Sequence, residues 1–135
     1  MAENFKLEII TPYRVFFSGE TETLVVSSLD GELGILANHE PIVAATDIGP
    51  ARIKIDGVWR EAAMADGFLE VEDNKVTMLV GSAEWPEEID VTRAQKSLAR
   101  AEERLKDVSM PWEQTRATRA LRRARLRLAL AQKTE

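Results

Sequence analysis

The chain has 135 residues and a mass of 15.1 kDa, enough for one or at most two small domains and too little for an enzyme of barrel size. Hydrophobic residues make up 44% and charged residues 30%, and no run of about 20 uncharged apolar residues is present, so we expect a folded, soluble protein without a membrane span. Cysteine is absent and His39 is the only histidine, which excludes disulfides, thiolate metal sites and cysteine nucleophiles. The N-terminal sequence predicts no signal peptide, and we expect a cytoplasmic chain.

Short runs of alternating polar and apolar residues fill the first part of the chain. They predict eight strands, over residues 5–10, 13–17, 23–27, 42–46, 51–55, 59–64, 68–72 and 76–80. Asp56-Gly57 and Asp73-Asn74 lie between successive strands and favour tight hairpin turns. This pattern predicts an antiparallel sandwich or barrel with one wet face on each sheet. We interpret the glycine-rich run 31–41, which contains His39, as a loop in which the imidazole has a structural role.

A helical period replaces the alternation after residue 88. Asp90 is a candidate N-cap for a first helix, and a second helix follows Ser109-Met110-Pro111. The apolar stripe of the second helix is rich in alanine, which predicts two helices lying close together as an antiparallel hairpin. Because alanine methyl groups bury little apolar area, we expect a thin seam that allows the hairpin to open.

The net charge changes from acidic to basic at the same position, after residue 88. Residues 1–88 carry 6 basic and 17 acidic residues, whereas residues 89–135 carry 12 basic and 6 acidic residues. We therefore predict an α+β fold with a β-sandwich domain over residues 1–84, a linker over 85–88 and a helical hairpin over 89–135.

Arginines follow one side of each predicted helix. Arg93, Arg100 and Arg104 fall within about 40° on the first helical wheel, and a row on the second spans about 80°, formed by Arg116, Arg119, Arg123 and Arg127. Such rows are typical of a solvated charged face, but guanidinium groups also clamp phosphates and carboxylates. The glycines match no nucleotide-binding loop, and no pair of carboxylates stands out, so we predict no catalytic residue in this chain.

One set of motifs resembles a known family. The segments 30–36 (DGELGIL) with His39 and Pro41, 65–71 (ADGFLEV) and 76–80 (VTMLV) are similar to epsilon subunits of F-type ATP synthases, and the resemblance covers nearly the whole chain. It implies a sandwich of about ten strands and a non-catalytic subunit of the rotating central stalk, bound to the gamma subunit and the c-ring. It also implies a rotor-contact loop containing Glu32 and His39, and a peripheral position on the cytoplasmic face of the cell membrane.

The family's helical hairpin implies a regulatory role. The resemblance implies that basic residues of the extended hairpin meet acidic segments of the beta subunits and inhibit ATP hydrolysis, with the alpha subunits as further partners; here this basic stripe would comprise Arg116, Arg119, Arg122, Arg123 and Arg127. Residues 89–94 (IDVTRA) are similar to a motif of bacillus-like epsilon subunits that bind ATP in the folded hairpin. The resemblance implies an ATP site formed by Glu84, Ile89, Asp90, Arg93, Ala94, Arg100, Arg123 and Arg127. ATP would be a regulatory ligand, and Mg²⁺ is open because Glu84 and Asp90 can act as acceptors or as metal ligands; no metal site is certain.

Two further hypotheses stand beside the rotor subunit. One is a stand-alone anion or nucleic-acid binding module, which the acidic sandwich and the lack of an aromatic stacking platform disfavour. The other is a small ATP-hydrolysing enzyme, which lacks a base, a metal cluster and a phosphate loop. We expect no nucleic-acid partner.

Overall fold

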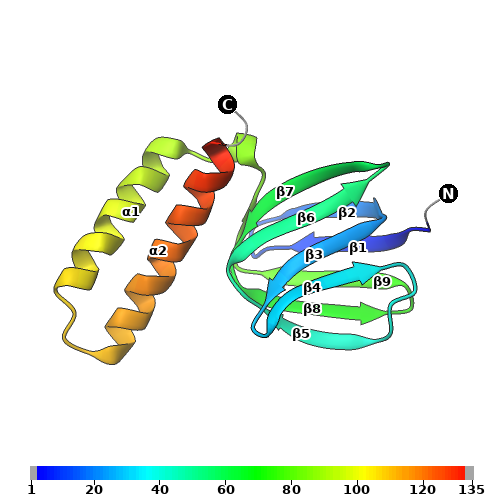
Figure 1. The fold of residues 1–135 in the computed structure, drawn as a ribbon, viewed down its shortest axis with the longest axis horizontal. Coiled ribbons are helices and arrows are strands. Elements are labelled where there is room, and N and C mark those ends of the chain that lie inside the picture. Colours follow the sequence, from blue (N-terminus) through cyan, green and yellow to red (C-terminus); the bar gives the residue numbers. More distant parts are fainter. Residues whose placement is uncertain (1–2, 133–135) are drawn as a thin grey trace. The chain divides into compact units, whose positions relative to one another are not determined.

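The computed structural model describes residues 3–132, which form two compact units. Unit 1 comprises Met1–Glu84 and contains the strands, and unit 2 comprises Trp85–Glu135 and contains the helices (Figure 1). The predicted fold class, a β-sandwich followed by two helices, is confirmed.

Ten strands build the sandwich: β1 (Phe5–Ile10), β2 (Val15–Thr21), β3 (Thr23–Ser28), β4 (Gly31–Leu36), β5 (Ile42–Thr46), β6 (Gly49–Ile55), β7 (Val58–Met64), β8 (Gly67–Glu72), β9 (Lys75–Val80) and β10 (Ala83–Glu84). They follow the order β10-β7-β6-β3-β5-β8-β9-β1-β2, with β4 paired to β3. A single residue pair, Ser28 with Thr46, joins β3 to β5. This weak joint separates a layer of β10, β7, β6, β3 and β4 from a second layer of β5, β8, β9, β1 and β2 (Figure 1).

The core lies between the layers because alternate residues of each strand point inward. Leu24 and Ile53 from the first layer and Leu7, Leu69 and Met78 from the second are completely buried. Both predicted hairpin turns are confirmed, since Asp56-Gly57 and Asp73-Asn74 have the positive φ angles that such turns require.

The strand prediction missed β4 and the two-residue β10, and it began β2 two residues too early. The run 31–36 forms β4, where a loop was expected, because a tight turn with Gly31 at φ 118° folds it back along the whole of β3. Its two glycines hide the apolar alternation that marks a strand. Tyr13 is 89% exposed and outside β2, since the Thr11 hydroxyl accepts hydrogen bonds from the backbone N–H groups of Tyr13 and Arg14 and fixes a turn there.

Unit 2 contains a short 3₁₀ helix, Pro86–Glu88, and two long helices, α1 (Val91–Lys106) and α2 (Pro111–Gln132). The long helices pack against each other as the predicted hairpin. Small residues make much of the seam, with Ala94 and Ala101 of α1 and Ala117, Ala124 and Ala131 of α2 all buried. Leu130 of α2 is buried too. Within residues 3–132, no helix is long and apolar enough to cross a membrane.

Candidate functional site

Asp90 fixes the start of α1, as predicted. Its side-chain oxygen Oδ1 accepts a hydrogen bond from the backbone N–H of Arg93 at 3.0 Å, which is the bond of an N-cap. Oδ2 makes no part of this cap and can accept from a ligand. Ala94 is fully buried one residue further on, while the Arg93 side chain is exposed. The first turn of α1 therefore presents a carboxylate and a guanidinium from one rigid element.

The remaining members of the predicted ATP site lie on several elements. Glu84 belongs to β10 of unit 1, and Ile89 is buried just before α1. Arg100 is two turns along α1, where its guanidinium donates to the hydroxyl of Ser97 at 3.2 Å. Arg123 and Arg127 lie one turn apart on α2 and are half-buried, and the Nε atom of Arg127 is buried. Seven of the eight predicted residues thus belong to unit 2.

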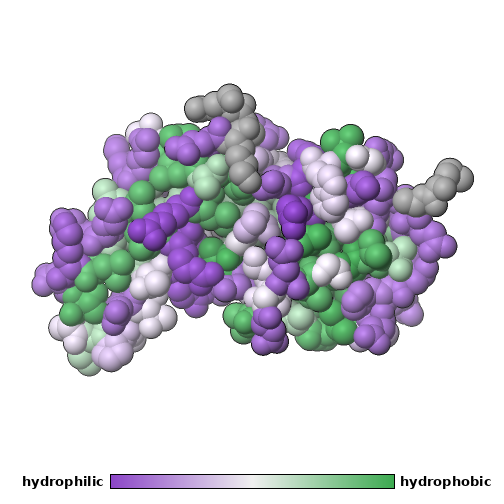
Figure 2. All heavy atoms as spheres, in the orientation of Figure 1, coloured by the Kyte–Doolittle hydropathy of each residue, from purple (hydrophilic) through white to green (hydrophobic). Residues whose placement is uncertain are grey.

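Three of the five arginines of the predicted basic stripe lie around one hollow on α2. Arg116, Arg119 and Arg123 line one hollow of about 420 Å³ together with Trp112 and Thr115, all from α2. In Figure 2 hydrophilic residues dominate the helical unit, and apolar residues show between them along both helices. This side of α2 is accordingly cationic, with one exposed aromatic ring at its N-terminal end.

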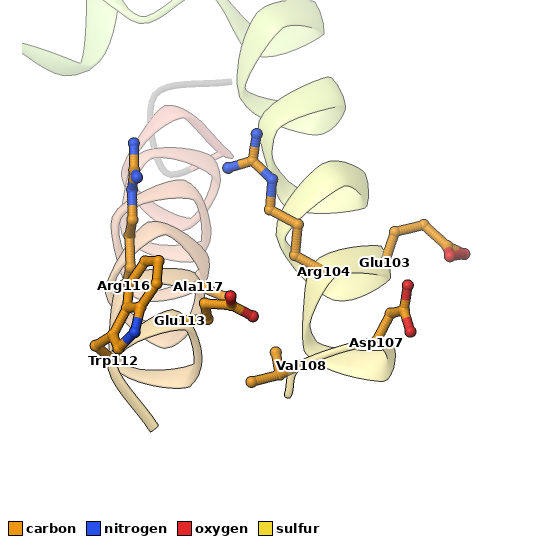
Figure 3. A pocket seen from close by; sticks show the side chains of 8 residues that line it. All are labelled: Glu103, Arg104, Asp107, Val108, Trp112, Glu113, Arg116 and Ala117. Atoms are coloured by element: carbon orange, nitrogen blue, oxygen red, sulfur yellow. The ribbon is translucent and has the colours of Figure 1, made fainter. Parts of the chain in front are cut away.

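A second cavity lies where α1 and α2 meet their connecting turn. It measures about 560 Å³ and is lined by Arg104, Val108, Trp112, Glu113, Arg116 and Ala117, among others. Figure 3 shows Arg104 on α1 and Trp112 with Arg116 on α2, so that both helices contribute to the cavity. Arg104 and Arg116 belong to the arginine rows visible in the sequence, whereas the cavity between them is visible only in the structure.

The predicted rotor-contact loop is not one loop. Glu32 lies on the outer face of β4 and pairs with Arg52 of β6 at 3.1 Å. His39 follows β4, and its Nδ1 atom is 2.8 Å from the backbone oxygen of Glu40. The expectation that Glu32 belongs to a loop was therefore wrong, because the strand β4 continues through it.

An apolar row that the sequence did not predict lies on the outer face of the second layer. Five residues are paired in register, one from each of β5, β8, β9, β1 and β2. In that order they are Ala45, Phe68, Leu79, Ile10 and Val15. Phe68 is 61% exposed, Leu79 55% and Val15 60%, and Val43 stands exposed two residues before Ala45. A contiguous exposed apolar patch is typical of a surface that another protein covers. The sequence does contain apolar residues at outward-facing strand positions. Only the strand register shows that these residues are neighbours in the sheet.

Among residues 3–132 no group of three or more histidine, aspartate or glutamate side chains is placed to hold a metal ion. The fold combines an apolar surface on the sandwich with a cationic helical hairpin. These two features are typical of a two-domain protein that binds other protein chains. Two family models match it in succession, the β-sandwich domain of ATP synthase delta/epsilon chains over residues 4–86 and their long α-helix domain over residues 87–132. The chain belongs to the ATP synthase delta/epsilon chain family.

Known proteins agree with this assignment. The chain is 52% identical to the ATP synthase epsilon chain of Caldicellulosiruptor bescii over 135 residues, which cover 100% of this chain and 98% of that one. A chain in a structure of OSCP, F1 and c-ring from Euglena gracilis mitochondrial ATP synthase has the same fold, with a TM-score of 0.79, 21% identity and coverage of 93% and 80%. A chain in a Tetrahymena thermophila structure of the mitochondrial ATP synthase central stalk and c-ring matches with a TM-score of 0.70, 14% identity and coverage of 96% and 98%.

Family membership makes the chain a subunit of ATP synthase that is not its catalytic subunit. It favours the subunit hypothesis over the stand-alone binding module and over the small hydrolase.

Proposed function

We propose that this chain is a rotor subunit of the central stalk, which couples the gamma subunit to the c-ring of a proton-translocating ATP synthase at the cytoplasmic face of the cell membrane. The observation that carries this proposal is the apolar row of the sandwich. Exposing such a row to water is unfavourable in free energy, and a permanent partner that covers the row removes this cost. The related chains of known structure come from a central stalk with its c-ring and from an F1 with its c-ring, which supports these partners.

Gel filtration tests this part of the proposal. The chain, the gamma subunit and the c-ring of the same organism are mixed at micromolar concentration, and co-elution is expected. Elution of the chain alone, while gamma and the c-ring still assemble, would contradict the rotor role.

The second part of the proposal is regulatory. The basic stripe of α2 gives the hairpin a cationic side, and its alanine seam buries little apolar area, so the hairpin can leave its folded form and dock on acidic segments of the beta subunits. Docking there inhibits ATP hydrolysis.

Charge variants separate this role from a general effect of the helix. Replacing Arg116 and Arg119 with glutamine is expected to raise ATP hydrolysis by the reconstituted complex. Arg125 lies opposite Arg116 on the wheel of α2, at about 180°, so Arg125→Gln is the matched control and is expected to leave inhibition unchanged. Equal inhibition by all these variants would contradict docking through the stripe.

The third part concerns ATP. The predicted ATP site uses Asp90 and Arg93 in the first turn of α1 together with Arg123 and Arg127 on α2, so ligand binding requires both helices in the folded hairpin. A ligand shifts a two-state equilibrium only through its different affinities for the two states. ATP accordingly favours the folded, non-inhibitory form. The free carboxylate oxygen of Asp90 and the exposed guanidinium of Arg93 suit the ribose or base and the phosphates.

Calorimetry of the isolated chain with ATP, with and without Mg²⁺, tests the site. The double variant Asp90→Ala, Arg93→Ala is expected to lose binding, and Arg125→Ala serves as control. Asp90→Ser keeps a side-chain oxygen for the cap, so it shows whether a loss comes from the missing carboxylate or from a frayed helix. Parental ATP affinity in the double variant would remove the site from these residues.

A further inference from the structure

We propose that the cavity at the turn of the helical hairpin is a binding site for a small planar monoanion, an aromatic ring that carries one carboxylate. The site is separate from the eight residues of the predicted ATP site, and the proposal does not depend on the chain's role in ATP synthase. It rests on the composition of the cavity, on its charge and on the two helices that build it.

The cavity has the size and the walls of a small-molecule site. Its volume of about 560 Å³ lies within the roughly 300–1,000 Å³ that such sites occupy. Val108 and Ala117 contribute apolar groups to its lining, and Trp112, 61% exposed, supplies a large aromatic face on which a planar ring can stack.

Two guanidinium groups are available to an anion. Arg104 of α1 and Arg116 of α2 both line the cavity, and within residues 3–132 neither guanidinium group makes an ion pair or a hydrogen bond. Figure 3 shows both side chains extending toward the same end of the hairpin, away from the turn. A guanidinium group binds a carboxylate through two parallel hydrogen bonds, which fixes the orientation of a planar ligand.

The nearby carboxylates limit the ligand to a single charge. Glu113 accepts a hydrogen bond from the backbone N–H of Ser109 at 3.4 Å, and Glu103 pairs with Lys106 at 3.5 Å. Asp107 lines the cavity as well, and Figure 3 shows it with Glu103 on the side of α1 that faces away from α2. Three carboxylates line the cavity against two guanidinium groups, so it has no excess positive charge for a triphosphate. Because Lys106 pairs with Glu103, and Glu103 and Asp107 lie on the side of α1 away from α2, the two guanidinium groups can still bind one carboxylate in a bidentate manner.

Binding at this site stabilises the hairpin, because the cavity exists only while α1 and α2 lie side by side. A ligand present at 100 times its dissociation constant increases the ratio of closed to open hairpin about 100-fold. On the proposed function, which this consequence alone assumes, such a ligand would oppose opening without occupying the ATP site.

The test uses benzoate as the probe and nuclear magnetic resonance of the full chain as the readout. Benzoate is expected to shift the indole N–H resonance of Trp112 saturably, with a dissociation constant on the order of millimolar for a ligand of this size. Acetate lacks the ring and phenol lacks the charge, so each is expected to bind at least about tenfold more weakly. Equal shifts with acetate would leave only non-specific anion binding and would overturn the proposal.

Variants assign the anion to its guanidinium groups. Arg104→Gln and Arg116→Gln are each expected to weaken benzoate binding about tenfold or more, while the exposed Arg125→Gln, outside the cavity, leaves it unchanged. Hydrogen exchange of the α2 amides checks that the variants still fold and is expected to slow when benzoate binds the parent. Parental affinity in both cavity variants, or no change in exchange at saturation, would refute the site. ATP binding to the same samples is an independent measurement, so failure here leaves the proposed function untouched.

Discussion

Replacing Phe68 with serine is expected to weaken the binding of the chain to its stalk partner far more than it weakens the fold. Phe68 is the largest side chain of the apolar row and is 61% exposed in the isolated chain. A phenylalanine side chain presents about 200 Å², so a partner that covers the row can bury roughly 120 Å² more of this ring. At about 25 cal/mol per Å² this burial contributes about 3 kcal/mol to association, or a factor of about 100 in affinity.

The expected loss of stability of the sandwich in Phe68→Ser is smaller than the loss of binding. The buried part of the ring is about 80 Å², and its loss destabilises the fold by at most about 2 kcal/mol, within the stability of a typical domain. Trp59 on β7 of the other layer is a matched aromatic residue that is 48% exposed.

The assay measures the affinity of the purified chain for the gamma subunit by surface plasmon resonance, with thermal unfolding of each variant measured in parallel. Phe68→Ser should bind about 100-fold more weakly and remain folded, whereas Trp59→Ser should bind like the parent. Affinity within twofold of the parent for Phe68→Ser, or an equal loss for Trp59→Ser, would refute the assignment of the apolar row to this partner.

Three further results are expected. Gly67→Ala should destabilise the sandwich by about 1–3 kcal/mol in chemical unfolding, because the added Cβ would meet the backbone oxygen of Leu79 and force β8 and β9 apart; unchanged stability would mean that this contact relaxes freely. Asp90→Ala should lower the stability of α1 by about 1 kcal/mol and reduce helical circular dichroism, while Asp90→Ser should restore most of it, since serine also caps the N–H of Arg93. A chain ending at Glu88 should keep one cooperative β-type unfolding transition, because the apolar core between the two sheet layers is complete within unit 1; a chain without any transition would contradict the independence of the sandwich.

Most elements of the fold could be predicted from short sequence patterns. The Asp-Gly and Asp-Asn pairs predicted two hairpin turns, and Asp90 predicted the first residue of α1, because each acts on backbone within a few residues of itself. β4 was missed since glycines at two of its six positions remove the side chains on which the alternation depends. The short β10 has only two residues, too few for any period to be recognised.

The functional surfaces were predicted unevenly. The arginine stripe of α2 follows from helix geometry alone, so its spacing was visible in the sequence. The apolar row requires the register of five strands, including the parallel pair β1 and β9, and no local pattern fixes that register. The turn cavity depends on how far Arg104 and Trp112, on different helices, lie from each other after packing. Contacts between distant segments thus decided what the sequence left open.

The regulatory role of the hairpin can be measured as the rate of ATP hydrolysis by a reconstituted ATP synthase that contains either the full chain or a chain ending at Glu88. Both forms retain the sandwich and its apolar row, so both should assemble, and only the full chain has the helical hairpin. Hydrolysis should be faster with the shortened chain, and the difference should become smaller as the ATP concentration rises and favours the folded hairpin. Equal rates at every ATP concentration, with both chains present in the complex, would contradict a regulatory hairpin.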